Sequence, residues 1–169
     1  GLGDADDELR ARLRRWFDVD TLAAPLAHGV VYPGILDLVS GLHRVMPMVV
    51  VTNKPTPLAR AVLDAAGVLP FVDAVFGADT AALRKPAPGM LLAAAQQLAI
   101  APEQLLMVGD SAPDMQSAHA AGCRAVLVPW GYGHHTLPNW LDPLRVSGPD
   151  ELLQVLLATR GAAEPLFNS

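Results

Sequence analysis

Two carboxylates four residues apart form the most distinctive polar cluster in the sequence. Asp110 and Asp114 lie in the segment VGDSAPD (108–114), where an apolar run gives way to a helical pattern, so both can face one point. Mg²⁺ prefers hard oxygen ligands, commonly one or two carboxylates with phosphate and water. An Asp or Ser cap of the helix is the alternative. Because a cap needs one polar group and three cluster here, the segment favours a metal site.

Two further segments carry polar groups suited to a phosphate. Thr52 and Asn53 follow an apolar run in VVVTNKP (49–55) and precede a helical pattern, whose N-terminus would offer N–H donors to an anion. A Thr or Asn cap explains that segment equally well. Lys85, in LRKPAP (83–88), indicates nothing alone. It is, however, one of only two lysines against ten arginines, and lysine presents a compact point charge.

Alternating strands and helices must position these residues. Short apolar or β-branched runs predict strands within residues 46–53, 73–77, 105–110 and 124–133. Helical periodicity with proline starts and glycine stops predicts helices within residues 5–17, 32–45, 55–68, 85–100, 112–122 and 148–161. This alternation predicts an α/β fold with right-handed crossovers and a parallel sheet. Ligands bind such sheets beyond the carboxyl ends of the strands, which is where the polar residues fall.

The composition narrows the class of protein. The 169 residues suffice for one domain, and a hydrophobic content of 51% excludes a disordered chain. A net charge of −5 without a basic run argues against a nucleic-acid partner. The longest apolar run (45–51) is too short to cross a membrane, and no secretory leader opens the sequence. A single cysteine, Cys123, allows no internal disulfide and favours a cytoplasmic location.

Taken together, the motifs resemble those of the haloacid dehalogenase-like hydrolase superfamily. TNK (52–54) is similar to its second motif, Lys85-Pro86 to its third and GDSAPD (109–114) to its fourth. YPG (32–34) and VPWGYG (128–133) are similar to the phosphoglycolate phosphatase branch. The resemblance covers roughly residues 30–155. It implies a three-layer, Rossmann-like core with a mostly parallel sheet.

The resemblance also implies a reaction. This would be Mg²⁺-dependent hydrolysis of a small phosphorylated metabolite such as 2-phosphoglycolate, through an aspartyl-phosphate. Catalytic roles are implied for Thr52, Lys85 and Asp114. Phosphate would be bound by Thr52, Asn53 and Lys85, and the metal by Asp110 and Asp114. Dehalogenases need no metal, so the acid-rich fourth motif favours a phosphatase.

The sequence differs from the family pattern at the first motif. It is a buried strand ending in Asp-x-Asp-Gly-Thr-Leu, whose first Asp attacks phosphorus. FDVDTL (17–22) is the only candidate for this motif in the sequence. However, it follows a charged helical pattern and lacks the glycine. Only eleven residues separate Asp20 from Tyr32, which is too few for a cap domain. A capless protein with Asp18 as nucleophile is the alternative. We expect instead a remnant of a helical cap and hinge at 1–29, a core at 30–160 and a flexible tail at 161–169.

This interpretation has two consequences. With the first-motif strand and most of the cap missing, two sheet edges would face each other across an apolar slot. The nucleophile would lie upstream, so we expect the chain alone to be inactive. The alternative function is a catalytically inactive phosphate- and metal-binding domain with a regulatory or partner-binding role. Retention of Lys85, Asp110 and Asp114 favours the enzyme.

Overall fold

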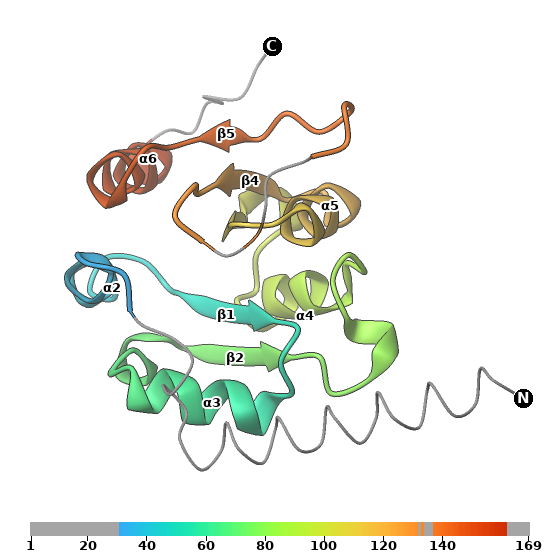
Figure 1. Ribbon diagram of the computed structural model, residues 1–169, viewed down its shortest axis with the longest axis horizontal. Helices are drawn as coiled ribbons and strands as arrows, with labels where there is room; N and C mark the ends of the chain where they lie inside the picture. Colours follow the sequence, from blue (N-terminus) through green and yellow to red (C-terminus); the bar gives the residue numbers. More distant parts are fainter. Residues whose placement is uncertain (1–30, 132, 134–136, 162–169) are drawn as a thin grey trace, which may run out of the picture.

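The computed structural model describes residues 31–131, 133 and 137–161 (Figure 1). The helix expected at 5–17, the cap remnant at 1–29 and the pair Asp18 and Asp20 lie outside these residues. The tail expected at 161–169 falls outside them as well, apart from its first residue. The strands, helices and strand-end residues expected from position 32 onward can be compared with the structure.

The described strands form two parallel sheets instead of one. In the first sheet β1 (Val49–Thr52) pairs with β2 (Ala74–Gly77). The second sheet has the order β3 (Leu106–Gly109), β4 (Arg124–Leu127) and β5 (Leu144–Arg145), and its strands are also parallel. The parallel α/β fold is therefore confirmed. The sequence did not predict β5, because its two exposed residues carry no apolar pattern.

Five α-helices in the described ranges connect and cover the strands. They are α2 (Ile35–Leu42), α3 (Thr56–Ala65), α4 (Gly89–Gln97), α5 (Ala112–Ala121) and α6 (Pro149–Gly161). Each lies within a range predicted from the sequence. Gly67 and Gly122 follow α3 and α5 with φ of 69° and 74°, left-handed values that glycine adopts without a steric cost. Three short 3₁₀ helices, at Leu69–Phe71, Ala81–Leu83 and Pro102–Gln104, complete the connections.

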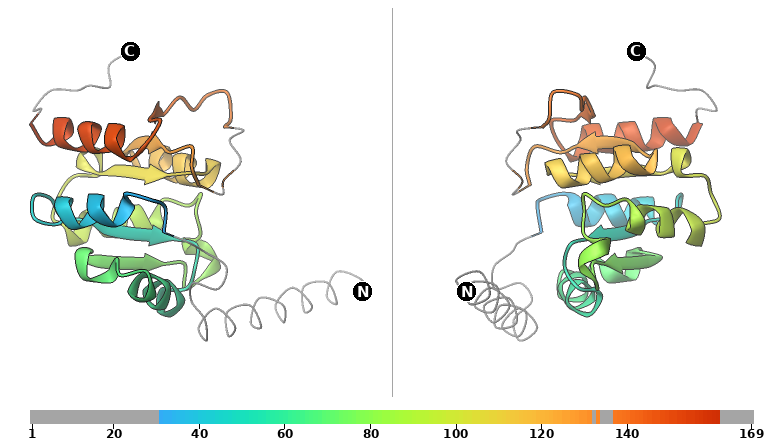
Figure 2. Two further views of the ribbon diagram at one scale, coloured as in Figure 1. Left: turned by 60° about the vertical axis from the view of Figure 1, so that its left-hand side comes forward. Right: turned by 90° about the vertical axis from the view of Figure 1, so that its right-hand side faces the viewer.

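The helices enclose the strands in three layers (Figures 1 and 2). One face of the sheets is covered by α2 and α6, which contact each other, and the opposite face by α4 and α5. Helix α3 packs on β2. Each helical layer therefore spans both sheets, as expected for the three-layer core.

Two hydrophobic clusters fill the spaces between these layers. The first contains Leu91, Met107, Ala118 and Ala121, and Val51 of the other sheet packs against it. The second contains Val126, Val128, Val146 and Leu152, and Leu38 of α2 packs against it. Both clusters combine residues from the two halves of the molecule. Burial of apolar surface therefore holds the sheets in one fold although they share no ladder of hydrogen bonds.

Strands β1 and β3 are neighbours without being hydrogen-bonded (Figure 2). Backbone groups alternate in direction along a strand. Thr52 O accepts a hydrogen bond from the segment after β2, so the preceding carbonyl, Val51 O, points the other way, toward β3. Likewise, Gly109 O accepts a hydrogen bond from the segment after β4, so the backbone of Val108 points toward β1. Among the described residues, no strand lies between the two edges. The expectation of facing sheet edges is confirmed.

Burial of the strands differs from the expectation at these edges. The continuous apolar runs at 46–53 and 105–110 predict buried strands, the first of them buried on both faces. All four residues of β1 are instead only half-buried, and Val108 of β3 remains 36% exposed. A strand that pairs with a single neighbour lacks the cover that a second neighbouring strand would supply. This explains the greater exposure of β1 and Val108.

Candidate active site

Lys85 lies at the centre of the candidate site. The loop after β2 brings its ammonium group to 2.6 Å from Oδ1 of Asp114, and the same group donates a hydrogen bond of 2.8 Å to Val51 O. The side chains of Lys85 and Asp114 are 10% and 6% exposed. Charged groups lose hydration when they are buried, so each of these two depends on the other. Lysine and aspartate, from separate predicted motifs, therefore form one unit.

Asp114 is held by several donors besides Lys85. Its Oδ2 accepts hydrogen bonds from Ser111 Oγ at 2.6 Å, from Ser111 N at 3.1 Å and from Asp110 N at 3.2 Å. These contacts stabilise the first turn of α5, as the capping interpretation predicted. The same carboxylate thus caps a helix with one oxygen and pairs with Lys85 through the other.

Asp110 stands at the tip of β3 and is positioned by a glycine-rich loop. Its Oδ2 accepts a hydrogen bond of 2.8 Å from Gly133 N. A Cβ built on Gly131 would overlap the Asp110 side chain, so only glycine fits that position. A role for Gly131 and Gly133 was not predicted from the sequence. The signal was the repeated glycine in GYG (131–133), in the loop that follows β4.

Thr52 and Asn53 lie at the end of β1, as predicted, and neither caps α3. Thr52 Oγ1 accepts a hydrogen bond of 3.2 Å from Lys54 N. The side-chain amide of Asn53 binds the backbone of Lys85, with Lys85 N donating to Oδ1 at 2.7 Å and Nδ2 donating to Lys85 O at 3.1 Å. The N-cap of α3 is Pro55, which has no side-chain hydrogen bond to the helix. Asn53 therefore contacts Lys85, whereas the hydroxyl of Thr52 contacts Lys54.

The N-terminus of α3 is occupied by a carboxylate that the sequence analysis missed. Thr56 N donates to Asp79 Oδ1 at 2.7 Å and Thr56 Oγ1 donates to Asp79 Oδ2 at 2.8 Å. The backbone N–H of Thr56, followed by its hydroxyl, lowers the pKa of Asp79 by stabilising the charged form. The N–H of Thr56 at this helix end is therefore bound by a carboxylate. No local pattern signalled this contact, because the partners lie 23 residues apart.

The predicted metal ligands fit Mg²⁺ to different degrees. Asp110 Oδ1 accepts no hydrogen bond from any described residue, whereas both oxygens of Asp114 are engaged by Lys85, Ser111 and the backbone. The part of the chain that the structure describes contains no group of three His, Cys, Asp or Glu side chains able to hold a metal. Mg²⁺ commonly takes one or two carboxylates and completes its shell with water and phosphate. Asp110 suits such a site.

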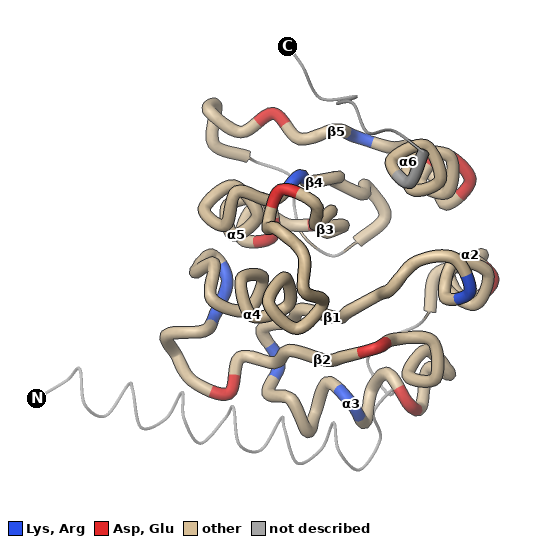
Figure 3. The backbone as a smooth tube through the Cα atoms, turned by 180° about the vertical axis from the view of Figure 1, so that it is seen from behind, with Lys and Arg blue, Asp and Glu red and all other residues tan. Residues whose placement is uncertain are grey.

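Figure 3 marks the charged positions along the described backbone. Lys and Arg, and likewise Asp and Glu, occur at separate positions on several helices, strands and loops. No helix in the described ranges is long and apolar enough to cross a membrane.

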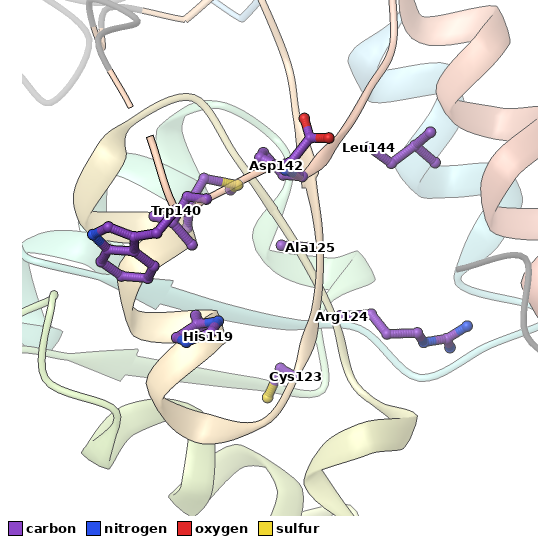
Figure 4. A pocket seen from close by; sticks show the side chains of 10 residues that line it. His119, Cys123, Arg124, Ala125, Trp140, Asp142 and Leu144 are labelled. Carbon is purple, nitrogen blue, oxygen red and sulfur yellow. The ribbon is translucent and has the colours of Figure 1, made fainter. Parts of the chain in front are cut away.

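A separate pocket of about 190 Å³ lies between α5 and the segment that leads into β5 (Figure 4). His119 and Trp140 contact edge to face at its rim, with ring centroids 4.9 Å apart. Cys123 also lines it, and burial together with the nearby Glu103 raises the pKa of this thiol. None of the predicted site residues lines this pocket.

The layered parallel sheets form a Rossmann-like α/β core, and the charged groups of the site lie at the carboxyl ends of its strands. A profile of the haloacid dehalogenase-like hydrolases matches residues 2–122, and the chain belongs to this family. The resemblance inferred from the motifs is therefore confirmed.

Curated relatives of the chain are phosphoglycolate phosphatases. The Escherichia coli (strain K12) protein is 34% identical over 160 residues, which cover 91% of this chain and 61% of the relative. The Rhodospirillum rubrum protein is 43% identical over 144 residues, covering 82% and 59%. The chain thus spans about three fifths of the length of these relatives. The phosphoglycolate phosphatase branch is confirmed as the place of this chain within the family.

Solved structures of phosphatases have a fold similar to that of this chain. A predicted phosphoglycolate phosphatase from Haemophilus somnus 129PT superposes with a TM-score of 0.70 at 26% identity, covering 88% of this chain and 64% of that one. CbbY from Rhodobacter sphaeroides in complex with phosphate gives 0.71 at 26% identity, covering 84% and 65%. D,D-heptose 1,7-bisphosphate phosphatase from B. bronchiseptica, complexed with magnesium and phosphate, gives 0.60 at 28% identity, covering 76% and 84%.

Proposed function

We propose that this chain carries the phosphate-handling core of a Mg²⁺-dependent phosphatase that acts on a small phosphomonoester such as 2-phosphoglycolate. One observation carries the proposal: the Lys85 ammonium is buried between Val51 O and Asp114 at the carboxyl ends of the strands. Support comes from the phosphoglycolate phosphatases among the relatives and from the phosphate complex of CbbY. The single cysteine is the ground for placing the protein in the cytoplasm.

Thr52, Asn53 and Lys85 would bind the transferring phosphoryl group. Because Thr52 Oγ1 accepts from Lys54 N, its own hydrogen is directed elsewhere and can be donated to a phosphate oxygen. The backbone N–H of Asn53 is the second donor that we assign to the phosphate. Lys85 supplies a fixed positive charge where negative charge develops in the transition state. Asp114 keeps that charge in place.

Asp110 would hold the metal ion, with Asp114 as the second predicted ligand. Oδ1 of Asp110 accepts no hydrogen bond from a described residue, and the loop at Gly133 holds Oδ2, so both observations support this role. When bound, Mg²⁺ supplies positive charge beside the phosphate and lowers the cost of bringing an anionic nucleophile to it. The magnesium and phosphate in the heptose bisphosphate phosphatase complex are consistent with such a site.

An aspartyl-phosphate mechanism also needs an attacking carboxylate. The aspartates that follow the described strands are engaged elsewhere: Asp79 with Thr56, Asp110 with the glycine loop, and Asp114 with Lys85. We therefore place the nucleophile outside the described residues and expect the 169-residue chain alone to be inactive. Asp18, which also lies outside them, remains the alternative within this sequence.

An assay of 2-phosphoglycolate hydrolysis with Mg²⁺ tests the proposal. It compares the 169-residue chain, its Asp18→Asn variant and a form extended upstream to the length of the relatives. We expect turnover by the extended form only. Turnover by the short chain that Asp18→Asn abolishes would make Asp18 the nucleophile. Failure of all three forms, with phosphate still bound, would favour the inactive binding domain instead.

A further inference from the structure

We propose that the side chain of Asn53 positions Lys85 and does not itself bind the phosphate. Both polar groups of its amide bind the backbone of Lys85: Oδ1 accepts from Lys85 N at 2.7 Å and Nδ2 donates to Lys85 O at 3.1 Å. These two bonds join the end of β1 to a loop residue 32 positions later. The amide cannot turn toward a substrate without breaking both of them.

The orientation of this amide follows from its partners. A backbone N–H can only donate and a backbone carbonyl can only accept, so Oδ1 must face Lys85 N while Nδ2 faces Lys85 O. The reversed amide would place donor against donor and acceptor against acceptor. Asparagine therefore matches both groups, whereas aspartate can satisfy only the N–H and alanine satisfies neither.

Lys85 is in this way fixed at both ends of its side chain. Asn53 holds the backbone from which the side chain starts, and Val51 O and Asp114 hold the ammonium group in which it ends. Asn53 and Val51 are two positions apart at the end of β1, so one strand supplies contacts at both ends. A long lysine side chain has many rotamers, and ordering it carries an entropic cost that these contacts offset.

In this arrangement the backbone and the side chain of Asn53 have different roles. Under the proposed function the backbone N–H faces the phosphate, while the side chain sets the place of the cation that meets the same phosphate. The inference rests on the proposed function for its catalytic meaning. The geometric part concerns Lys85 alone, and a measurement that needs no turnover can test it.

The sequence offers a simple spectroscopic test, because Lys54 and Lys85 are its only lysines. Lysine labelled with ¹³C at Cε gives two side-chain signals, which Lys54→Arg assigns. In Asn53→Ala we expect the Lys85 signal to move to the position of a freely rotating lysine. Limited acetylation at constant pH should modify Lys85 about tenfold faster than in the parent, as expected for the loss of two hydrogen bonds.

Two variants control this test. Asn139→Ala removes an exposed amide far from the site in sequence and should leave the Lys85 signal unchanged. Asn53→Asp keeps the shape and the acceptor but not the donor, so its signal should lie between those of the parent and Asn53→Ala. An unchanged Lys85 signal in a folded Asn53→Ala protein would overturn the inference. If that variant does not fold, an unchanged signal in Asn53→Asp overturns it equally, whether or not the chain hydrolyses phosphate esters.

Discussion

The ammonium of Lys85 lies 2.6 Å from Oδ1 of Asp114, and this ion pair links the two sheets of the molecule. Lys85 follows β2 of one sheet and also binds Val51 O of β1, whereas Asp114 belongs to α5, which packs on β3 and β4 of the other. The group assigned to phosphate is therefore a structural contact as well. Changes to it should alter both stability and ligand binding.

Removal of Lys85 alone should strongly destabilise the protein. Lys85→Met leaves the buried Asp114 carboxylate without its cation, and loss of one member of a buried pair costs about 3–5 kcal/mol. The free energy of unfolding, measured by urea denaturation, checks this. In the double variant with Asp114→Asn the cost should be smaller than the sum of the two single costs, because no lone charge remains. Arg60→Met, at an exposed position of α3, is the matched control. Additive costs would contradict the pairing.

Thr52→Val should weaken phosphate binding while leaving the fold intact. Valine has nearly the shape of threonine but lacks the hydroxyl hydrogen assigned to a phosphate oxygen. A hydrogen bond to a charged group is worth about 1.5–3 kcal/mol, so affinity for inorganic phosphate should fall at least about tenfold. Titration calorimetry in the presence of Mg²⁺ measures this. Thr159→Val, on α6, is the control and should bind as the parent does. Equal affinities of the parent and Thr52→Val would remove Thr52 from the site.

Gly131→Ala should impair the metal site. The added methyl group would overlap the Asp110 side chain, so either the loop or the carboxylate must move. We expect weaker Mg²⁺ binding, again measured by calorimetry, together with retained helical content by circular dichroism. Gly148→Ala places its methyl group in open space and should leave Mg²⁺ affinity unchanged. Equal loss in both variants would mean that the effect does not act through Asp110.

Asp79→Asn should change how stability depends on pH. The pKa of Asp79 is lowered in the folded protein by the N–H and hydroxyl of Thr56, so the charged form stabilises the fold. That contribution is complete above the ordinary carboxyl pKa and is lost as pH falls through the lowered value. The stability difference between the parent and Asp79→Asn should therefore be constant from about pH 5 to 8 and shrink below about pH 4. Denaturation at a series of pH values measures it.

Cys123 should react slowly with thiol reagents near neutral pH. Burial raises the pKa of this thiol and the charge of Glu103 raises it further, so little of the reactive thiolate is present. The rate of alkylation by iodoacetamide should keep rising above pH 9, beyond the range of an ordinary cysteine. Glu103→Gln should accelerate the reaction at pH 8. A rate equal to that of a free thiol would contradict the assigned environment.

The sequence predicted local elements of structure more fully than contacts between distant segments. Strands β1 to β4 and helices α2 to α6 followed from apolar periodicity and from the glycines after α3 and α5, which are local signals, whereas β5 did not. The meeting of Lys85 with Asp114 followed from the rule that strand ends converge, supported by the family motifs. Contacts such as Asp79 with Thr56 and Asn53 with the Lys85 backbone join distant segments through single side chains. No periodicity encodes such contacts, so they required the structure.

The interruption between β1 and β3 has a consequence for the energetics of ligand binding. Cohesion of the two halves depends on helix packing and on contacts such as that of Lys85, because no backbone ladder crosses the interruption among the described residues. A phosphate that attracts the Lys85 ammonium competes with Val51 O and Asp114 for it. Phosphate binding and the strength of the contact between the two sheets are therefore thermodynamically linked. The protein bound to phosphate and the free protein should differ in how readily one half moves against the other.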